Sequence, residues 1–147
     1  NKYGPVVVGV DGSEVSRRAT EVAFEEAAAR GAELHAVHTW VDTQIQGPGA
    51  GYAVSEDHWK AVQAEKDELL SSYLNELSEQ YPDVVVKKAI TRDRPVRALA
   101  AAAQGAQLLV TGSHGRGGFK GMLLGSTSRA LLQEAPCPMM VVRTQDL

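Results

Sequence analysis

Cysteine is almost absent from this 147-residue sequence, and the single one, Cys137, cannot form an internal disulfide. No apolar run approaches the roughly 20 residues that a membrane-spanning helix needs. The first residues lack the basic start and apolar stretch of a signal peptide. The net charge is −3, with both signs mixed along the chain, which argues against a broad basic face for nucleic acid. We therefore expect a cytoplasmic protein that binds neither membranes nor nucleic acid.

Several catalytic motifs are also missing. The sequence has no G-x-x-x-x-G-K-[ST], no G-x-S-x-G and no H-E-x-x-H, which excludes a Walker P-loop ATPase and the common hydrolases and zinc proteases. The four histidines, His35, His38, His58 and His114, do not have a metal-ligand spacing supported by cysteines. We expect no metal site formed by protein ligands alone and no catalytic residue.

Apolar, β-branched runs alternate with helical patterns along the chain. Near-continuous runs of this kind are typical of strands that are covered on both faces of a parallel sheet. The predicted strands are Pro5 to Val10, Ala32 to Val41, Val84 to Ile90, Gln107 to Thr111 and Cys137 to Arg143. The predicted helices run from an N-cap at Ser13 to Gly31, from Glu56 to near Pro82, from Pro95 to Gly105, and from near Ser126 to Pro136. This order predicts an α/β fold, an open five-stranded parallel sheet with helices on both faces.

Two predicted strand ends carry unusual residues, and the second of them is suited to an anion. Strand one ends at Asp11, and strand four leads into the glycine-rich segment 112–118 and then the helix start at 125–127. Small residues let backbone amides approach phosphate oxygens, and a helix N-terminus favours negative charge. Arg116 and Lys120 can add positive charge. The alternatives are a flexible loop before an ordinary serine cap, and Asp11 as a capping partner of the first helix.

These residues resemble a known family. Gly112-x-x-Gly115, nine residues and then Gly125-Ser126 match the G-2x-G-9x-G-[ST] signature of the universal stress proteins. The opening VVVGVDGSEVSRRA and the closing PCPMMVV are similar to that family as well. Residues 1–147 are therefore interpreted as one universal stress protein domain, closest to the second domain of a tandem-domain member and so expected to be part of a longer protein.

The resemblance implies a strand order of 3-2-1-4-5, a Rossmann-like fold and a site for ATP, with Mg²⁺ accompanying the phosphates. It also implies a homodimer, or pairing with another universal stress domain, through the last strand around Pro138 to Arg143. The residues that it assigns to the nucleotide are Gly9, Val10, Asp11, Thr39, Thr111, Gly112, Ser113, His114, Gly115, Arg116, Gly117, Gly118, Gly125, Ser126 and Thr127.

The leading hypothesis for function is an ATP-binding regulatory protein, not an efficient enzyme, whose conformation or partners change with nucleotide occupancy. One alternative is binding of cyclic AMP, and another is a slow ATP-hydrolysing, autophosphorylating or adenylating enzyme of related fold. A signalling receiver domain needs a phosphorylatable aspartate after the third strand and a lysine after the fifth. It fits poorly, because Thr91 and Arg143 stand near those two places. We also expect Gly112→Ala to place a methyl group near the ribose with little loss of fold.

Overall fold

The computed structural model describes residues 3–11, 13–39, 56–91, 95–113 and 125–143. Strands and helices alternate strictly along these residues, as the sequence predicts. In chain order the elements are β1 (Val6–Val10), α1 (Glu14–Arg30), β2 (Leu34–Thr39), α2 (Glu56–Gln80), β3 (Val86–Thr91), α3 (Pro95–Ala102), β4 (Leu108–Gly112), α4 (Ser126–Glu134) and β5 (Met139–Val142). None of the helices in the described ranges is long and apolar enough to cross a membrane.

The five strands form one parallel sheet in the order β3-β2-β1-β4-β5. This order and the open α/β architecture are those predicted. β1 is central, and its pairing with β2 on one side and β4 on the other puts Val8 opposite both Ala36 and Val110. The chain therefore winds in opposite directions on the two sides of β1, and a switch of this kind leaves a crevice beyond the carboxyl ends of the strands.

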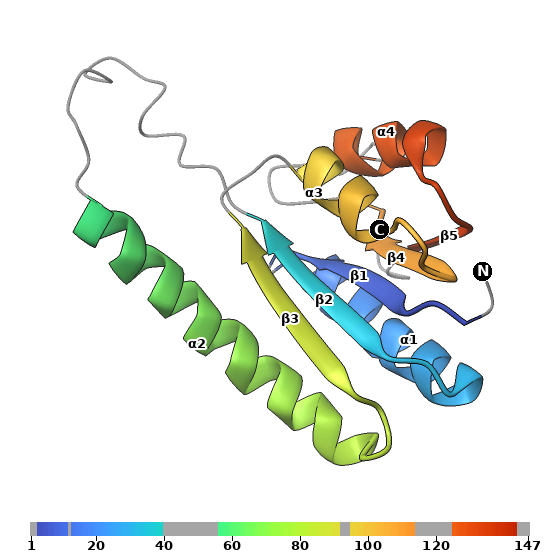
Figure 1. Ribbon diagram of the computed structural model, residues 1–147, viewed down its shortest axis with the longest axis horizontal. Helices are drawn as coiled ribbons and strands as arrows, with labels where there is room; N and C mark the ends of the chain where they lie inside the picture. Colours follow the sequence, from blue (N-terminus) through green and yellow to red (C-terminus); the bar gives the residue numbers. More distant parts are fainter. Residues whose placement is uncertain (1–2, 12, 40–55, 92–94, 114–124, 144–147) are drawn as a thin grey trace.

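Helices cover the two faces of the sheet, as Figure 1 shows. On one face α1 and the inner side of α2 pack against the even-numbered residues of β1, Val6 and Val8. On the other face α3 and α4 pack against Val7 through Leu99 and Leu131. Because side chains alternate along a strand, β1 contributes to both cores, and Val6, Val7 and Val8 are fully buried.

The predicted ends of α1 are confirmed. Ser13 is the N-cap, and its Oγ accepts a hydrogen bond of 3.1 Å from the amide of Ser16. At the other end Gly31 has φ 64°, a left-handed conformation that glycine adopts without the steric penalty of a Cβ. Pro95 begins α3, as its fixed φ and missing amide hydrogen favour.

The edge strand β3 differs from the expectation of a strand covered on both faces. Lys87, Lys88 and Ala89 in its centre are exposed. The reason is its position: β3 lies at the edge of the sheet, where α2 packs beside it (Figure 1) and buries Leu70, which faces the α1 core. Charged lysines on an edge strand also discourage pairing with another sheet.

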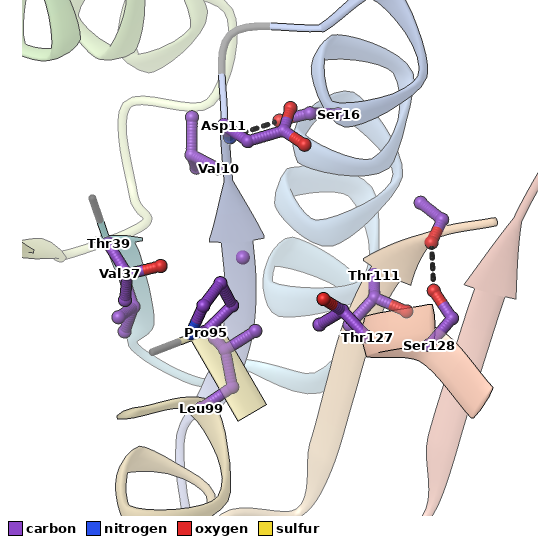
Figure 2. A pocket seen from close by; sticks show the side chains of 12 residues that line it. Val10, Asp11, Ser16, Val37, Thr39, Pro95, Leu99, Thr111, Thr127 and Ser128 are labelled. Carbon is purple, nitrogen blue, oxygen red and sulfur yellow. Dashed lines mark hydrogen bonds between the residues drawn. The ribbon is translucent and has the colours of Figure 1, made fainter. Parts of the chain in front are cut away.

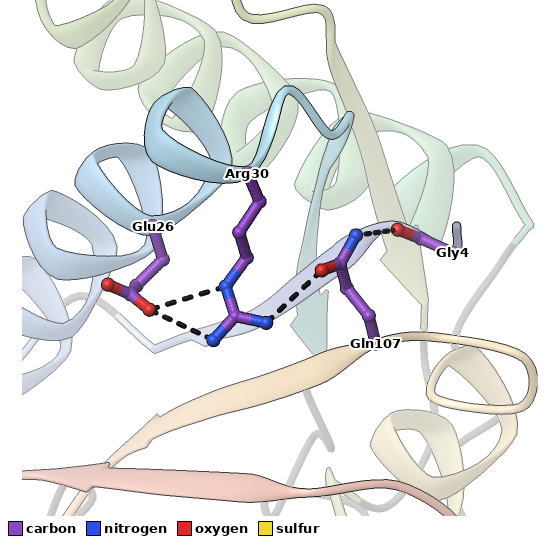
Figure 3. A network of polar contacts seen from close by, with 4 residues as sticks. All are labelled: Gly4, Glu26, Arg30 and Gln107. Carbon is purple, nitrogen blue, oxygen red and sulfur yellow. Dashed lines mark hydrogen bonds and ion pairs between the residues drawn. The ribbon is translucent and has the colours of Figure 1, made fainter. Parts of the chain in front are cut away.

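A polar network joins β1 and β4 at the amino-terminal end of the sheet (Figure 3). Gln107, only 8% exposed, donates from Nε2 to the Gly4 carbonyl at 2.7 Å and accepts from Arg30 Nη1 at 3.1 Å. Arg30 is also paired with Glu26 at 3.1 Å. The network orders the entry into β1 and holds α1 beside it, and it lies at the end of the sheet opposite the crevice.

Candidate functional site

A pocket opens beyond the carboxyl ends of β1, β2 and β4, on the side of the sheet that α3 and α4 cover (Figure 2). It contains about 540 Å³ of space, counting the part open to solvent. This is the crevice expected from the strand order, and we call it the crevice below. The residues that line it are Gly9, Val10, Asp11, Ser16, Val37, Thr39, Pro95, Leu99, Thr111, Gly112, Thr127 and Ser128.

The crevice has an apolar wall and a polar wall. The apolar wall consists of Val37 at the end of β2 and of Pro95 and Leu99 on α3. The floor between the walls is Gly9, where a Cβ would lie only 2.9 Å from Leu99 Cδ1. The polar wall consists of Thr127 in the first turn of α4 and of Thr111 at the end of β4, whose hydroxyl oxygen is itself buried. This division suits a ligand with one flat apolar end and one polar or charged end.

Asp11 lines the crevice and also shapes the turn into α1. Its Oδ1 accepts a 2.8 Å hydrogen bond from the amide of Ser13, and its own amide donates to Ser16 Oγ at 3.0 Å. The alternative interpretation of Asp11, a partner for the start of the first helix, is therefore correct for one carboxylate oxygen. No described residue bonds to the other, Oδ2, so Asp11 can hold the turn and still offer an acceptor to a ligand.

The N-terminus of α4 is fixed against the end of β4. Ser128 is buried, and its Oγ donates a 2.6 Å hydrogen bond to the carbonyl of Gly112 (Figure 2). The Gly125 amide donates to the Ser113 carbonyl at 2.6 Å. The first bond within the helix runs from the Arg129 amide to the Gly125 carbonyl, so the preceding amides of the first turn have no helical acceptor. These amides, with the helix dipole, make the polar wall a suitable place for an anion.

Thr111 is unusual among the residues of the polar wall. Its side chain is 4% exposed, and its Oγ1 is a buried polar atom without a hydrogen-bond partner in the described structure. Buried hydroxyls nearly always have a partner, so an orphaned one calls for an explanation.

The predicted site residues fall into three groups. Seven of the fifteen line the crevice: Gly9, Val10, Asp11, Thr39, Thr111, Gly112 and Thr127. Three more lie at the neighbouring ends of β4 and α4: Ser113 is buried, Gly125 is the N-cap of α4, and Ser126 begins that helix. The other five, His114, Gly115, Arg116, Gly117 and Gly118, lie outside the described residues, as does Lys120.

Five residues of the crevice were not predicted: Ser16, Val37, Pro95, Leu99 and Ser128. Val37 could have been found from the sequence, because it stands two residues before Thr39 and shares its side of the strand. Leu99 and Ser128 could not, since they reach the crevice only through the packing of α3 and α4.

The expected effect of Gly112→Ala is wrong. A Cβ at Gly112 would lie 2.6 Å from Val15 Cγ1 and 3.3 Å from Val15 Cβ. Gly112 therefore turns its missing side chain toward α1, away from the α3 and α4 side, and the glycine serves close packing between β4 and α1. The substitution would disturb the fold before it reached a ligand.

Comparison with known proteins shows to which family the chain belongs. The model of the universal stress protein family matches residues 2–143. The chain belongs to the universal stress protein family. Universal stress protein Rv2005c of Mycobacterium tuberculosis (strain ATCC 25618 / H37Rv) is 48% identical over 143 residues, which are 97% of this chain and 46% of that protein. The chain thus spans about half the length of the curated relatives it matches, and its expected place as the second domain of a tandem protein stays a prediction.

Solved structures share the fold. The hypothetical protein MJ0577 superposes with a TM-score of 0.73 at 20% identity, over 99% of both chains. A universal stress protein solved in complex with cAMP has a TM-score of 0.66 at 26% identity, over 95% of this chain and 96% of that one. The first shows the likeness of fold, and the second is a family member with an adenine nucleotide bound.

Proposed function

We propose that the crevice binds an adenine nucleotide, with ATP as the ligand, and that occupancy regulates the conformation or partners of the protein. The observation that carries the proposal is the two-walled crevice at the switch point of the sheet, with an apolar wall facing a polar wall formed by β4 and the start of α4. The cAMP complex of a relative 26% identical to this chain supports an adenine nucleotide as the ligand class.

The described residues fit such a ligand. The apolar wall of Val37, Pro95 and Leu99 can cover a base, and the amides at the start of α4, which have no acceptor within the helix, can donate to phosphate oxygens. Asp11 Oδ2 can accept from a ribose hydroxyl. Each hydrogen bond to a charged phosphate contributes about 1.5–3 kcal/mol, so a few of them suffice for micromolar affinity, roughly 8 kcal/mol, after ordering costs. Mg²⁺ would accompany the phosphates, which together with water supply the oxygen ligands it prefers.

We further propose that binding, and not turnover, is the function of the site. Among the described residues that line the crevice, Asp11 is the one with an acid–base side chain, and one of its oxygens is engaged by the Ser13 amide. A general base must lie within hydrogen-bond reach of the proton it takes and be free to accept it. This arrangement favours a nucleotide sensor over an efficient ATPase.

A short path of hydrogen bonds connects the polar wall with the edge strand β5. The Ser113 carbonyl accepts from Gly125 at the start of α4, while the Ser113 amide donates to the Val142 carbonyl at 2.8 Å. The backbone of one residue, Ser113, therefore bonds both to the start of α4 and to β5. Met139, Met140 and Val141 of β5 are half-buried at the open edge of the sheet. We propose that β5 pairs with a second copy or with another universal stress domain, and that occupancy of the crevice alters this pairing.

Calorimetry and thermal unfolding test the proposal. ATP at about 100 times its Kd should stabilise the fold by roughly 2.7 kcal/mol, which is a rise in Tm of about 5–11 °C for a domain of this size. GTP is the matched control for recognition of the base. Cyclic AMP tests the alternative ligand, which the cAMP complex of the relative supports. A larger shift with cAMP than with ATP would transfer the proposal to the cyclic nucleotide, and unchanged melting with both would refute nucleotide binding.

A further inference from the structure

We propose that Ser16 is a positioning residue of the crevice: its hydroxyl accepts the Asp11 amide and so fixes the Asp11 carboxylate for a hydroxyl of the ribose. The inference rests on the proposed function and deepens it. It gives a role to a serine that the predicted set of nucleotide residues leaves out, and it ties recognition of the sugar to the start of α1.

Asp11, Ser13 and Ser16 form a closed ring of three hydrogen bonds at the turn from β1 into α1. The Ser13 amide donates to Asp11 Oδ1 at 2.8 Å, and the Ser16 amide donates to Ser13 Oγ at 3.1 Å. The Asp11 amide closes the ring by donating to Ser16 Oγ at 3.0 Å. Each residue donates with its backbone and accepts with its side chain, so Asp11 is held both at its amide and at one carboxylate oxygen.

Ser16 is not needed to cap α1. Ser13 is the N-cap, and Ser16 is the third residue of the helix. In a capping box this position carries Glu or Gln, whose longer side chain accepts the amide of the N-cap residue. Ser16 is 3% exposed, and its hydroxyl accepts the amide of Asp11 instead. Alanine is the better helix former where a position requires only packing, so the bond to Asp11 is what the serine adds.

The ring matters because a carboxylate can rotate. The χ2 torsion of aspartate is broad and nearly twofold, so a carboxylate tied at one oxygen alone can still turn. The bond to Ser16 fixes the backbone from which the side chain extends, and the bond from the Ser13 amide fixes Oδ1. Oδ2, to which no described residue bonds, is then left in one place. An acceptor that is already ordered adds no ordering cost when a ligand binds.

The position of the ring identifies the part of the ligand. Asp11 and Ser16 both line the crevice, and Figure 2 shows the bond between them beyond the end of β1. β1 lies between β2, which contributes to the apolar wall, and β4, which contributes to the polar wall. Asp11 therefore stands where the sugar would join the base to the phosphates. A ribose hydroxyl can donate, and an ionised carboxylate only accepts.

The test is calorimetric binding of ATP and of 2′,3′-dideoxy-ATP, which lacks both ribose hydroxyls, to the wild type and to variants of the ring. The wild type should bind ATP at least about 10-fold more tightly than the dideoxy nucleotide, the effect of one hydrogen bond to a charged group. In S16A this ratio should fall to within about threefold, because Oδ2 is no longer held in place. D11N puts an amide nitrogen in the place of Oδ2 and should lower the ratio equally, and S16A/D11N should lower it no further.

T20V is the matched control within the same helix. Thr20 is fully buried, and its Oγ1 donates to the Ser16 carbonyl at 2.8 Å without belonging to the ring. T20V should lower the Tm and keep the wild-type ratio. Both ligands are measured on the same protein, so a change in the folded fraction cancels in the ratio. S16C, whose thiol is a weak acceptor, should give a ratio between those of the wild type and S16A, and it takes the place of S16A should that variant not fold.

The outcomes separate this proposal from the function on which it rests. A wild-type ratio in S16A and S16C would overturn the role of Ser16, and so would a T20V ratio as low as that of S16A. A wild type that bound ATP and its dideoxy analogue equally would overturn the assignment of Asp11 to the ribose while leaving nucleotide binding in place. If the wild type bound neither ligand, the proposed function would fail instead, which is a distinguishable result.

Discussion

The contact between Gly112 and Val15 gives a quantitative prediction about how β4 and α1 are joined. An alanine at position 112 would place its Cβ 2.6 Å from Val15 Cγ1, where ordinary carbon contacts lie at about 3.5–4.0 Å. Val15 is 9% exposed and lies in α1, where valine has one strongly preferred χ1 rotamer. The side chain cannot turn away at low cost, so the strand and helix must move apart.

The expected magnitude follows from two opposing effects. Overpacking of this kind costs about 1–3 kcal/mol. Gly112 is not among the described glycines with positive φ, so alanine can adopt its backbone and gains about 0.4–1 kcal/mol from a less flexible unfolded chain. We expect G112A to lose about 1–2 kcal/mol of unfolding free energy, which corresponds to a fall in Tm of about 2–8 °C.

A double-mutant cycle checks the cause. V15A alone removes two methyl groups and should cost about 1.6 kcal/mol at about 0.8 kcal/mol each. In V15A/G112A the colliding atom is gone, so the double variant should be more stable than the sum of the single effects by about 1–2 kcal/mol. Urea unfolding at equilibrium measures all four proteins. Strictly additive free energies, or a G112A protein as stable as the wild type, would refute the assignment of this glycine to packing.

Two further predictions concern single side chains. S128A removes the 2.6 Å donor of the partly buried Gly112 carbonyl, so urea unfolding should show a loss of about 1–3 kcal/mol, whereas S72A on the exposed side of α2 should show almost none. Burial, with a contribution from the Glu21 carboxylate, raises the pKa of Tyr73 to about 12, and its hydroxyl donates to the Arg17 carbonyl at 2.9 Å. A raised pKa in the folded state means that the fold favours the neutral phenol. The resulting contribution of Tyr73 to the free energy of unfolding is complete below the pKa of the unfolded chain, about 10, and disappears as the pH rises through about 12. Unfolding midpoints in urea at pH 9 and pH 11 should therefore fall further for the wild type than for Y73F, and equal falls would contradict the assignment.

Most of the fold could be predicted from local sequence signals. The apolar runs mark the five strands, and Ser13, Gly31 and Pro95 mark helix ends through capping and backbone preferences that act within a few residues. The prediction that β3 is covered on both faces was wrong, because an apolar run does not show whether a strand lies in the centre or at the edge of a sheet. Lys87 and Lys88 within that run were the available sign of an edge.

The site was predictable only in part. Strand ends follow from the sequence, and Asp11, Thr39 and Thr111 indeed meet at one crevice because parallel strands end at the same edge. The apolar wall on α3 and the Ser128 contact depend on how helices dock on the sheet, which local patterns do not encode. The sequence also did not show that a side chain at position 112 would point toward α1. A glycine motif indicates that small residues are needed, but not which face of the sheet requires them.

The end of β4 explains why neighbouring positions in one motif can have different roles. Successive residues of a strand point to opposite faces. Thr111 therefore faces the crevice between the sheet and α4, while Gly112 faces Val15 on α1. The carbonyl of Gly112 accepts from Ser128, so the backbone between the two faces also fixes the helix that supplies the polar wall. It follows that a variant at position 111 should act on ligand affinity and a variant at position 112 on stability, although one peptide bond separates them.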